Sequence, residues 1–410
     1  MPEFFTVLPP AEALARLFEH LPLAPPAEII PVAEALDRVT FEAIRAPASL
    51  PAFPRSMMDG YAVRAQDTFG ASQSLPAYLT VVGEAPMGRA PAFEVKAAQA
   101  ALIHTGGMLP PGADAVVMIE VTQPSRENEI EVLKAVAPGE NVLRVGEDIL
   151  ESAEMLPAGR WLRPQDLGGL SALGFTHIRV ARRPRVALLA TGDEIVPPEA
   201  EAGPGQVRDV NSYSVAGQIA RAGGLPIRCG IVPDNFAALQ AAAQAALAQA
   251  DMLVLSAGSS VSVRDMTADV VNSLGRPGLL AHGVAVKPGK PTILAVADGK
   301  PVVGLPGNPV SAMVIADLFV TPTLYKLQGC AAPPPRQSVR ARLTHNLASQ
   351  AGRVDYVPAR LVERDGEPQA EPVFGKSNQI FTLVFADGMI TIPRDANGVS
   401  AGEIVEVRLF

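Results

Sequence analysis

Residues 283–311 read GVAVKPGKPTILAVADGKPVVGLPGNPVS, and this stretch decides the central fold. Its two apolar runs are flanked by two glycine-proline loops, KPGKP at 287–291 and PGNP at 306–309. Proline fixes φ and glycine permits conformations that other residues avoid, so both loops are predicted to be short and rigid. The first loop carries Lys287 and Lys290, and the second leads into a helical pattern whose first N–H groups favour an anion. We therefore expect this stretch to form the floor of an anion-binding active site.

The composition indicates a globular protein of several domains. The chain has 410 residues, of which 48% are hydrophobic, and a length prior suggests roughly two to four domains. A net charge of -8 argues against a general nucleic-acid binder, which needs clustered Lys and Arg. The N-terminus lacks the basic and apolar regions of a signal peptide, and no apolar run is expected to span a membrane. Cys229 and Cys330 cannot build a disulfide framework or a four-ligand zinc site, so we expect a cytoplasmic protein.

From Arg183 onward, expected strands alternate with loops and expected helices. The expected strands cover 185–190, 226–232, 252–256 and 302–305, and the expected helices cover 211–222, 237–250, 266–274 and 310–327. Such alternation predicts a parallel sheet with helices on both faces, that is, a three-layer α/β domain over 183–329. Ligands of such sheets bind at the carboxyl ends of the strands.

Three further domains are predicted around this centre. Helical patterns at 11–20, 32–45 and 163–173 favour an elongated arm domain made of 1–50 plus 147–182. Short apolar runs separated by turn residues predict an inserted β-rich domain over 51–146. After the linker AAPPPRQ, apolar runs at 338–343, 380–385, 389–392 and 404–409 are interpreted as strands, which predicts a C-terminal β-barrel domain over 330–410.

Carboxylates follow the expected strands of the central domain. Asp193 and Glu194 follow the first strand, Asp234 the second and Asp265 the third. Because they would share one edge of the sheet, they could hold Mg²⁺, which prefers oxygen ligands and often bridges to substrate phosphates. Each aspartate taken alone is explained as well by capping a turn or helix. Glu194 is less easily explained in that way, because an apolar pair and two prolines follow it.

Other candidate motifs are weak when taken singly. Lys287 and Lys290 could bind an anion or lie solvated at the surface, and Asp59 in SMMDGYAV could simply form a turn before an apolar run. His104 is expected to be packed. The loop AGSSVSV at 257–263 lacks the spacing of a Walker A motif, which excludes a P-loop NTPase, and a hydrolase triad has no support.

Taken together, these strings resemble the molybdopterin molybdenumtransferase family, known in bacteria as MoeA and in animals as the E domain of gephyrin. Nine strings match in the family's order and spacing across nearly the whole chain: SMMDGYAV at 56, HTGG at 104, GADAVVMIE at 112, GEDI at 146, TGDE at 191, the Asp of VPDN at 234, VLSAGSSVSVRD at 254, VKPGKP at 286 and GLPGNPVSA at 304.

The resemblance implies the four domains described above and a homodimer whose site lies between the central domain of one subunit and the inserted domain of the other. It also implies a reaction, the last step of molybdenum cofactor biosynthesis. Molybdenum from molybdate is inserted into the dithiolene of adenylylated molybdopterin with Mg²⁺, and AMP is released. The molybdopterin adenylyltransferase and molybdoenzyme chaperones are further partners that it suggests.

The family's functional positions are carried over residue by residue. The implied catalytic residues are Asp59, Thr105, Glu194 and Asp265. The implied metal ligands are Asp148, Glu194, Asp234 and Asp265. The implied substrate-binding residues are Ser256, Gly258, Ser260, Lys287, Lys290, Pro306 and Pro309.

One loop departs from the family's pattern. Where most members read SGGVSVG, this chain has Ala257, Ser259 and Ser262 in place of Gly, Val and Gly. The added side chains could narrow the pocket or add hydroxyl contacts. This loop motivates an alternative, a non-catalytic molybdopterin-binding or scaffolding homologue. An adenylyltransferase or nucleotide hydrolase built on the central domain is a third hypothesis, against which the inserted and C-terminal domains argue.

Overall fold

The computed structural model describes residues 7–21, 25–257 and 261–410, without the side chains of residues 261–265. They form two compact units, each of which is described by itself. The core unit comprises Met1–Glu42, Ala158–Leu167 and His177–Phe410, and the insert unit comprises Ala43–Pro157 and Gly168–Thr176.

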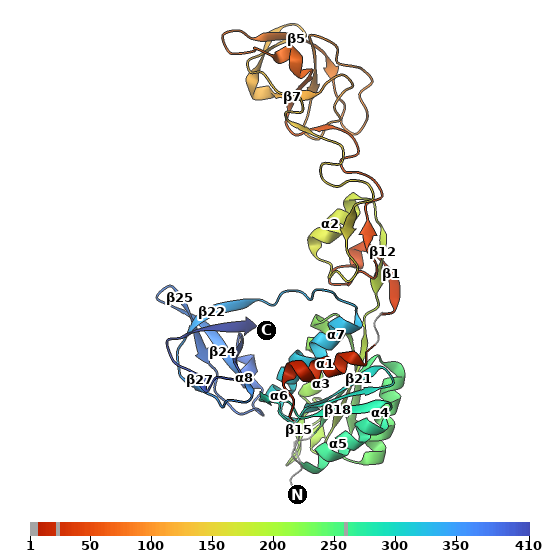
Figure 1. Ribbon diagram of the computed structural model, residues 1–410, viewed down its shortest axis with the longest axis vertical. Coiled ribbons are helices and arrows are strands. Elements are labelled where there is room, and N and C mark those ends of the chain that lie inside the picture. The colour runs from red at the N-terminus through yellow and green to blue at the C-terminus, as the bar shows by residue number, and fades with distance from the viewer. Residues whose placement is uncertain (1–6, 22–24, 258–260) are drawn as a thin grey trace. The chain divides into compact units, whose positions relative to one another are not determined.

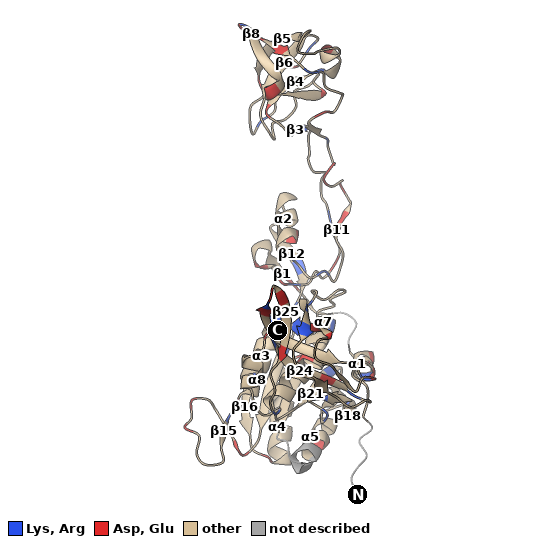
Figure 2. Ribbon diagram, turned by 90° about the vertical axis from the view of Figure 1, so that its left-hand side faces the viewer, with Lys and Arg blue, Asp and Glu red and all other residues tan. Residues whose placement is uncertain are grey.

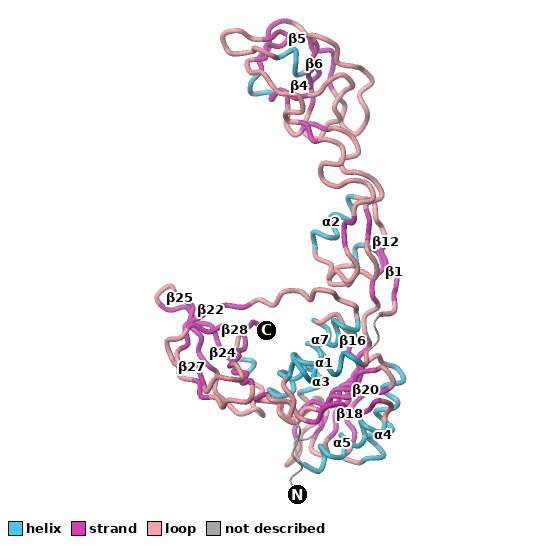
Figure 3. The backbone as a smooth tube through the Cα atoms, in the orientation of Figure 1, coloured by secondary structure: helices cyan, strands magenta, loops and turns pink. Residues whose placement is uncertain are grey.

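A six-stranded sheet forms the centre of the core unit (Figures 1 and 3). Its strands in spatial order are β16 (Leu225–Val232), β13 (Arg185–Thr191), β17 (Met252–Ala257), β21 (Lys300–Pro306), β20 (Ile293–Ala297) and β18 (Pro277–His282). The first four run parallel, as predicted, whereas β20 is antiparallel to both of its neighbours. The predicted α/β class is confirmed, with a sheet that is mixed rather than wholly parallel.

Strand β20 runs antiparallel to β21 because a tight turn within residues 283–311 connects the two strands. Ala297 pairs with Lys300, so only Asp298 and Gly299 connect β20 to β21. Both have positive φ, 50° and 82°, as the two-residue turns that suit the twist of a hairpin require. A two-residue connection can only join antiparallel strands, whereas a parallel crossover needs a dozen residues or more.

Helices cover both faces of this sheet. They are α1 (Pro10–Glu19), α3 (Asn211–Arg221), α4 (Phe236–Gln249), α5 (Val261–Ser273), α6 (Pro309–Ile315) and α7 (Thr321–Leu327). Alternate residues along each strand face opposite layers. Leu188 and Val254 pack in one core with α3 and α6, whereas Leu189 and Leu255 pack in another with α4 and α5. This arrangement is the predicted three-layer architecture.

The segment Pro309–Leu327 is continuous, because a π-helical turn at Ala316–Val320 joins α6 to α7. The sequence was expected to lack a membrane-spanning run, but this 19-residue segment is long and apolar enough to cross a membrane, and its most apolar 18-residue window has a mean hydropathy of 1.4. That is weak support for a span, because 61% of its most apolar window is buried inside the protein and core helices pass the same test.

The N-terminal region differs in part from its prediction. The expected helix over 11–20 is α1, which packs against β18 and β20. The expected helix over 32–45 is wrong: the structure has a 3₁₀ turn at Val32–Glu34 and the short strand β2 (Ile44–Arg45). Pro31 before this turn and the positive φ of Asp37 within the segment oppose a continuous helix.

One further prediction for the arm is confirmed, since α2 (Pro164–Ala172) matches the helix expected over 163–173. The antiparallel pair of β1 (Ala27–Pro31) and β12 (His177–Ala181) was not predicted. The boundaries of the four predicted domains stay predictions.

The insert unit is rich in strands, as predicted. One sheet has the order β7 (Ala115–Met118), β4 (Gly60–Val63), β6 (Gln99–Ile103), β5 (Ala77–Glu84), β9 (Glu129–Val132) and β8 (Thr122–Arg126). Two short pairs join β3 (Arg55–Ser56) to β10 (Val142–Leu143), and β2 to β11 (Glu154–Leu156). Short 3₁₀ turns lie at Ala65–Thr68 and Ile119–Val121. Val63, Leu79 and Ile130 are buried in its core.

The C-terminal strands close into a five-stranded barrel. Its strands are β22 (Ser338–Leu343), β24 (Val354–Arg364), β25 (Glu367–Pro372), β26 (Gly388–Ile392) and β28 (Ile404–Leu409), and pairing of β24 with β26 closes the ring. The small pair β23 (Leu347–Ala348) and β27 (Gly398–Val399) flanks it. The strand expected over 380–385 is wrong, because this run forms the short helix α8 (Phe381–Val384). Its apolar residues Phe381, Val384 and Phe385 have helical spacing.

Two other features complete the core unit. Strand β14 (Ile195–Val196) pairs in parallel with β15 (Val207–Arg208), and the connection between them is a long loop that extends from the central sheet (Figure 2).

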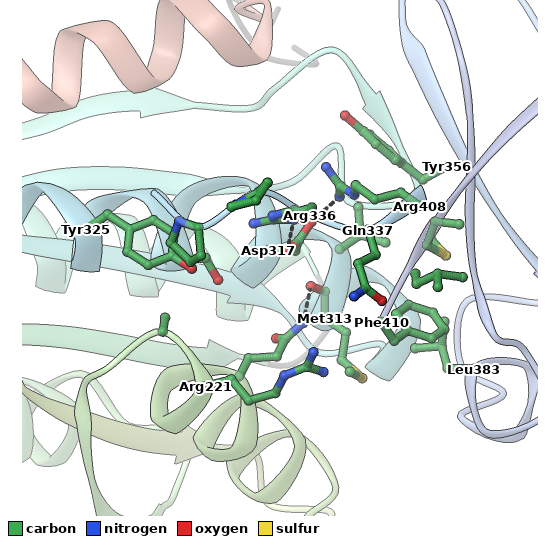
Figure 4. Close-up of a pocket in the computed structure, with 18 residues that line it drawn as sticks. Arg221, Met313, Asp317, Tyr325, Arg336, Gln337, Tyr356, Leu383, Arg408 and Phe410 are labelled. Carbon is green, nitrogen blue, oxygen red and sulfur yellow. Dashed lines mark hydrogen bonds and ion pairs between the residues drawn. The ribbon is translucent and has the colours of Figure 1, made fainter. Parts of the chain in front are cut away.

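A cavity of about 480 Å³ lies between the helices and the barrel. Beside it the carboxylate of Asp317, on the π-helical turn, accepts hydrogen bonds from Arg336 of the linker and Arg408 of β28 (Figure 4).

Candidate functional site

The hairpin of β20 and β21 brings the two glycine-proline loops to one edge of the sheet. Ile293 at the start of β20 pairs with Gly304 near the end of β21. KPGKP precedes β20 and PGNP follows β21, so the antiparallel register places them side by side. On the other flank Ala257, the last residue of β17, pairs with Pro306. The end of the third strand and both loops therefore share this edge.

Gly289 shows how tightly the first loop is packed. Its φ is +116°, and a Cβ at this position would lie 2.6 Å from the Cδ1 and Cγ1 atoms of Ile315 in α6. Only glycine suits both constraints. The loop that carries Lys287 and Lys290 is therefore held in one conformation by packing against α6, while both lysine side chains stay exposed.

The C-terminal barrel contacts the same loop directly. Val286 and Lys287 form strand β19, which pairs in parallel with Val354 and Asp355 of β24. The side chain of Asp355 is 3% exposed and accepts a hydrogen bond from Arg353 Nε at 2.9 Å. Its second oxygen lies 3.7 Å from Nζ of Lys287. A buried carboxylate needs such partners, so Asp355 fixes both cations at the edge.

A pocket of about 1290 Å³ lies between the two loops and the barrel. Four cationic side chains line it, those of Lys287, Lys290, Arg353 and Lys376, and Asp355 is a lining carboxylate that two of them already share. Among the described residues, neither Lys290 nor Lys376 has an ion-pair partner. The pocket is therefore net positive and suits a ligand with several anionic oxygens.

The sequence analysis missed the contribution of the barrel to this pocket. Arg353, Asp355 and Lys376 follow the opening stretch by more than forty residues, and their local motifs give no sign of the strand pairing that brings them there. Ser377 also belongs to this group. Asn308 donates from Nδ2 to its hydroxyl at 2.9 Å, and the N–H of Val310 donates to its carbonyl at 3.0 Å.

The expected anion site at the start of the helix after PGNP is consequently partly closed. Pro309 has no N–H, and the N–H of Val310 is used by Ser377. The positive charge at this edge comes mainly from side chains of the loops and the barrel, and less from the N-terminus of α6. Pro306 and Pro309 remain predicted substrate-binding residues, placed at the rim and at the start of the helix.

The carboxylates at the ends of β13 and β16 form a small hydrogen-bonded group. Thr191 Oγ1 donates to Asp234 Oδ1 at 2.8 Å, and the N–H of Asp234 donates to Asp193 Oδ1 at 3.1 Å. Asp193 thus has a local role, as its alternative explanation allowed. Glu194 is exposed and has no hydrogen-bonded or ionic side-chain partner among the described residues. Its carboxylate is available to a ligand or metal.

The other predicted residues are distributed as follows. Ser256 lies at the end of β17 and is half-buried. Gly258 and Ser260 lie outside the described residues, and Asp265 lies in α5 with a side chain that is also outside them. Asp148 is exposed and belongs to the insert unit, whereas Glu194, Asp234 and Asp265 belong to the core unit. Among described side chains, no cluster of three potential His, Cys, Asp or Glu metal ligands is formed.

In the insert unit, the two predicted catalytic residues contact each other. Thr105 donates to Asp59 Oδ1 from its N–H at 2.7 Å and from its hydroxyl at 3.0 Å. These two bonds lower the pKa of Asp59 below its ordinary 3.8, the N–H contributing more, and His104 adds a smaller lowering. Asp59 is therefore an ionised, exposed acceptor at neutral pH.

His104 differs from its prediction. It was expected to be packed, but its side chain is 47% exposed and lies 3.2 Å from Glu84 and 3.8 Å from Asp59. Asp59 is thus contacted by both Thr105 and His104, and His104 also reaches Glu84.

Three family models match consecutive parts of the chain and together cover most of it. The family model described as the MoeA N-terminal region (domain I and II) matches residues 8–174, the probable molybdopterin binding domain matches 187–326, and the MoeA C-terminal region (domain IV) matches 340–410.

Named relatives and solved structures agree with these matches. The molybdopterin molybdenumtransferase of Haemophilus influenzae is 33% identical over 403 residues, which cover 97% of this chain and 98% of that protein. That of Bacillus subtilis is 32% identical over 99% of this chain and 94% of its own. The crystal structure of the molybdopterin biosynthesis MoeA protein from Pyrococcus horikoshii OT3 matches with a TM-score of 0.86 and 31% identity, covering 99% of this chain and 100% of that one. The chain belongs to the MoeA family of molybdopterin molybdenumtransferases.

Proposed function

We propose that this chain inserts molybdenum from molybdate into the dithiolene of adenylylated molybdopterin and releases AMP, as the last step of molybdenum cofactor biosynthesis. Family membership along the whole chain supports the reaction class. The observation that carries the proposal is the net-positive pocket at the loop edge. Molybdate, the terminal phosphate and the adenylate are all anionic, so a site for them needs fixed cations and N–H groups.

The residues of the pocket divide this task. Lys290 and Lys376 are exposed cations without ionic partners among the described residues, so they can pair with oxyanions of the substrates. Lys287 and Arg353 are held by Asp355, which sets their positions while leaving them partly exposed. Positions fixed before the substrate binds lower the cost of reorganisation during the reaction.

We also propose that Mg²⁺ is the cofactor. Glu194 and Asp234 offer carboxylate oxygens at neighbouring strand ends, which fits the preference of Mg²⁺ for oxygen ligands, and the resemblance adds Asp148 and Asp265. When bound, the ion neutralises phosphate charge and polarises its oxygens. The hydrogen bond from Thr191 orients Asp234 and leaves its second oxygen for a ligand.

The family resemblance further supports a cytoplasmic homodimer. In this proposal Asp59 and Thr105 of one subunit complete the site of the partner, where the ionised Asp59 accepts a hydrogen bond from the substrate. The molybdopterin adenylyltransferase and molybdoenzyme chaperones are proposed as the proteins that supply the substrate and accept the product.

The test is AMP release from adenylylated molybdopterin, with molybdate and Mg²⁺, together with reconstitution of a cofactor-dependent enzyme. We expect turnover by the wild type and about a tenfold lower kcat/KM for Lys290→Ala, because one charge-assisted contact is lost. Lys300→Ala is the matched control. This lysine lies at the opposite end of β21, where its Nζ donates to the carbonyl of Leu247 at 2.6 Å. Its loss should leave kcat/KM within about twofold, since it makes no contact at the loop edge.

Wild-type protein that releases no AMP above background, beside a working positive control, would overturn the transferase proposal. Tight binding of the substrate in that protein would instead support the alternative, a non-catalytic molybdopterin-binding or scaffolding homologue. Equal kcat/KM of Lys290→Ala and wild type would show that the pocket does not bind the substrate.

A further inference from the structure

Asn211 connects two loops of the candidate site. It is the first residue of α3 and is 8% exposed. Its Nδ2 donates to Ser256 Oγ at 2.7 Å, at the end of β17, and to the carbonyl of Gly307 at 2.8 Å, within PGNP. A single buried side chain therefore links the segment before the altered glycine-serine loop to the second loop of the opening stretch.

The orientation of this amide follows from its partners. The carbonyl of Gly307 can only accept, so the atom facing it must be the nitrogen. Both N–H groups are then used, one for each loop. The remaining atom, Oδ1, is buried and has no hydrogen-bond partner among the described residues. The two hydrogen bonds that Nδ2 donates therefore set the orientation of the amide.

Among the described residues, backbone pairing between these two segments stops just before Gly307. Strands β17 and β21 pair from Leu253 with Val302 to Ala257 with Pro306, where the described pairing ends. Gly307 is the next residue of its loop. The bond from Asn211 to Gly307 thus adds a connection one residue beyond the described pairing, at the edge where the substrate is proposed to bind.

We propose that Asn211 is a positioning residue, which fixes the spacing between the Ser256 loop and PGNP and so shapes the substrate site. The inference rests on the proposed function, because it assigns these loops to binding of adenylylated molybdopterin. Asn211 acts through Ser256 and Gly307. It suits the task because its amide offers two donors on a short side chain, which aspartate of the same shape lacks.

The same helix provides a matched control. Gln218 lies seven residues further along α3, and its Nε2 donates to the carbonyl of Met313 in α6 at 3.2 Å. Its Oε1 is likewise buried without a partner among the described residues. Asn211 and Gln218 therefore each donate a hydrogen bond from α3 to a backbone carbonyl of the segment 307–313. Asn211 bonds to Gly307 in the loop, and Gln218 bonds to Met313 in α6. Replacing either amide by a carboxylate removes the donors without changing the size of the side chain.

The experiment measures binding of adenylylated molybdopterin in the absence of molybdate, by calorimetry, to wild type, Asn211→Asp, Asn211→Ala and Gln218→Glu. We expect the Kd to rise about tenfold or more in both Asn211 variants and to change less than about twofold in Gln218→Glu. Thermal unfolding should shift by a similar amount in Asn211→Asp and Gln218→Glu. A purely structural defect lowers the fraction of binding-competent protein, and hence the stoichiometry, without changing the Kd of the remainder.

The outcomes separate this inference from the proposed function. Unchanged Kd values in both Asn211 variants would overturn the positioning role, and so would an equal loss in Gln218→Glu. Tight wild-type binding, with no AMP release once molybdate and Mg²⁺ are added, would overturn the transferase and leave the positioning role standing. Failure of the wild type to bind adenylylated molybdopterin would overturn both.

Discussion

Asp355 shows how one buried carboxylate can organise a cationic site. Its side chain is 3% exposed, and it is shared by Arg353 and Lys287, which are 34% and 58% exposed. The carboxylate offsets part of their charge and fixes where they lie, whereas Lys290 and Lys376 keep their full charge for a ligand. This division lets the pocket stay positive while part of its lining is rigid.

Asp59 allows a prediction about pH. Its pKa is lowered chiefly by the N–H of Thr105 and next by the hydroxyl of Thr105. A lowered folded-state pKa contributes stability above the unfolded pKa of about 3.9, and this contribution is lost as pH falls through the folded pKa. Thr105→Val should therefore raise the pKa of Asp59, but only in part, because the N–H remains. Carboxyl NMR titration measures this directly.

The control for that titration is Thr122→Val, in the same unit, because the hydroxyl of Thr122 donates to the carbonyl of Ile119 and touches no carboxylate. This change should leave the Asp59 pKa unaltered. An equal Asp59 pKa in wild type and Thr105→Val would show that the hydroxyl has no part in ionising the carboxylate.

The site depends on the β20–β21 hairpin and on the KPGKP loop before it, and one positive-φ glycine from each makes a matched pair. Gly299 in the turn has open space around it, whereas a Cβ on Gly289 would meet Ile315. We expect Gly299→Ala to cost about 1 kcal/mol through its left-handed φ alone. Gly289→Ala should cost about 2–4 kcal/mol, since overpacking adds to backbone strain, and should also weaken anion binding.

Denaturant unfolding gives both free energies, and titration with molybdate gives the affinity. If both variants lost the same stability and bound molybdate equally well, the packing of KPGKP against α6 would not be what shapes the pocket.

The elements that the sequence predicts well are those with local patterns. The strands and helices that were predicted between Arg185 and Leu327 are present, because apolar runs and helical spacing are properties of neighbouring residues. The edge strand β18 and the pair β14 and β15 were not predicted. The Asp298-Gly299 pair is also a local sign of a hairpin. The alternation of strands and helices before it, however, led to the prediction of a parallel sheet. The apolar run at 380–385 was taken for a strand although its spacing suits a helix.

Parts of the site could not be predicted because they depend on distant pairing. Asp59 and Thr105 are 46 residues apart yet share two hydrogen bonds, and the family motifs alone identified them. Nothing in RVDYV at 353–357 indicates that it adds a strand to KPGKP. Asn211 was expected only to begin a helix, since its two partners lie 45 and 96 residues away.

For the molecule as a whole, the attachment of the barrel decides the shape of the pocket. On the pocket side, β19 pairs with β24 and Asn308 bonds Ser377. Elsewhere on the same helical segment, Asp317 accepts from both Arg336 and Arg408. These contacts together fix the barrel against the α/β domain, so a change at Asp317 should alter the anion affinity of the pocket.

Asp317→Asn tests this coupling. Its carboxylate is 24% exposed, so losing the two ion pairs should cost only about 1–2 kcal/mol of unfolding free energy. We expect molybdate affinity to fall about threefold or more, because the barrel side of the pocket is less fixed. The control is Glu367→Gln, which breaks an exposed pair with Arg342 within the barrel itself. Equal molybdate affinity in the two variants would contradict coupling through Asp317.

The central claim is that the loop-and-barrel pocket holds the anionic groups of the substrates. A crystal structure of the wild type soaked with molybdate and adenylylated molybdopterin, with an anomalous difference map at the molybdenum edge, tests it most directly. The predicted result is a molybdenum peak in the pocket lined by Lys287, Lys290, Arg353 and Lys376. A peak at full occupancy elsewhere, with this pocket empty, would contradict the claim.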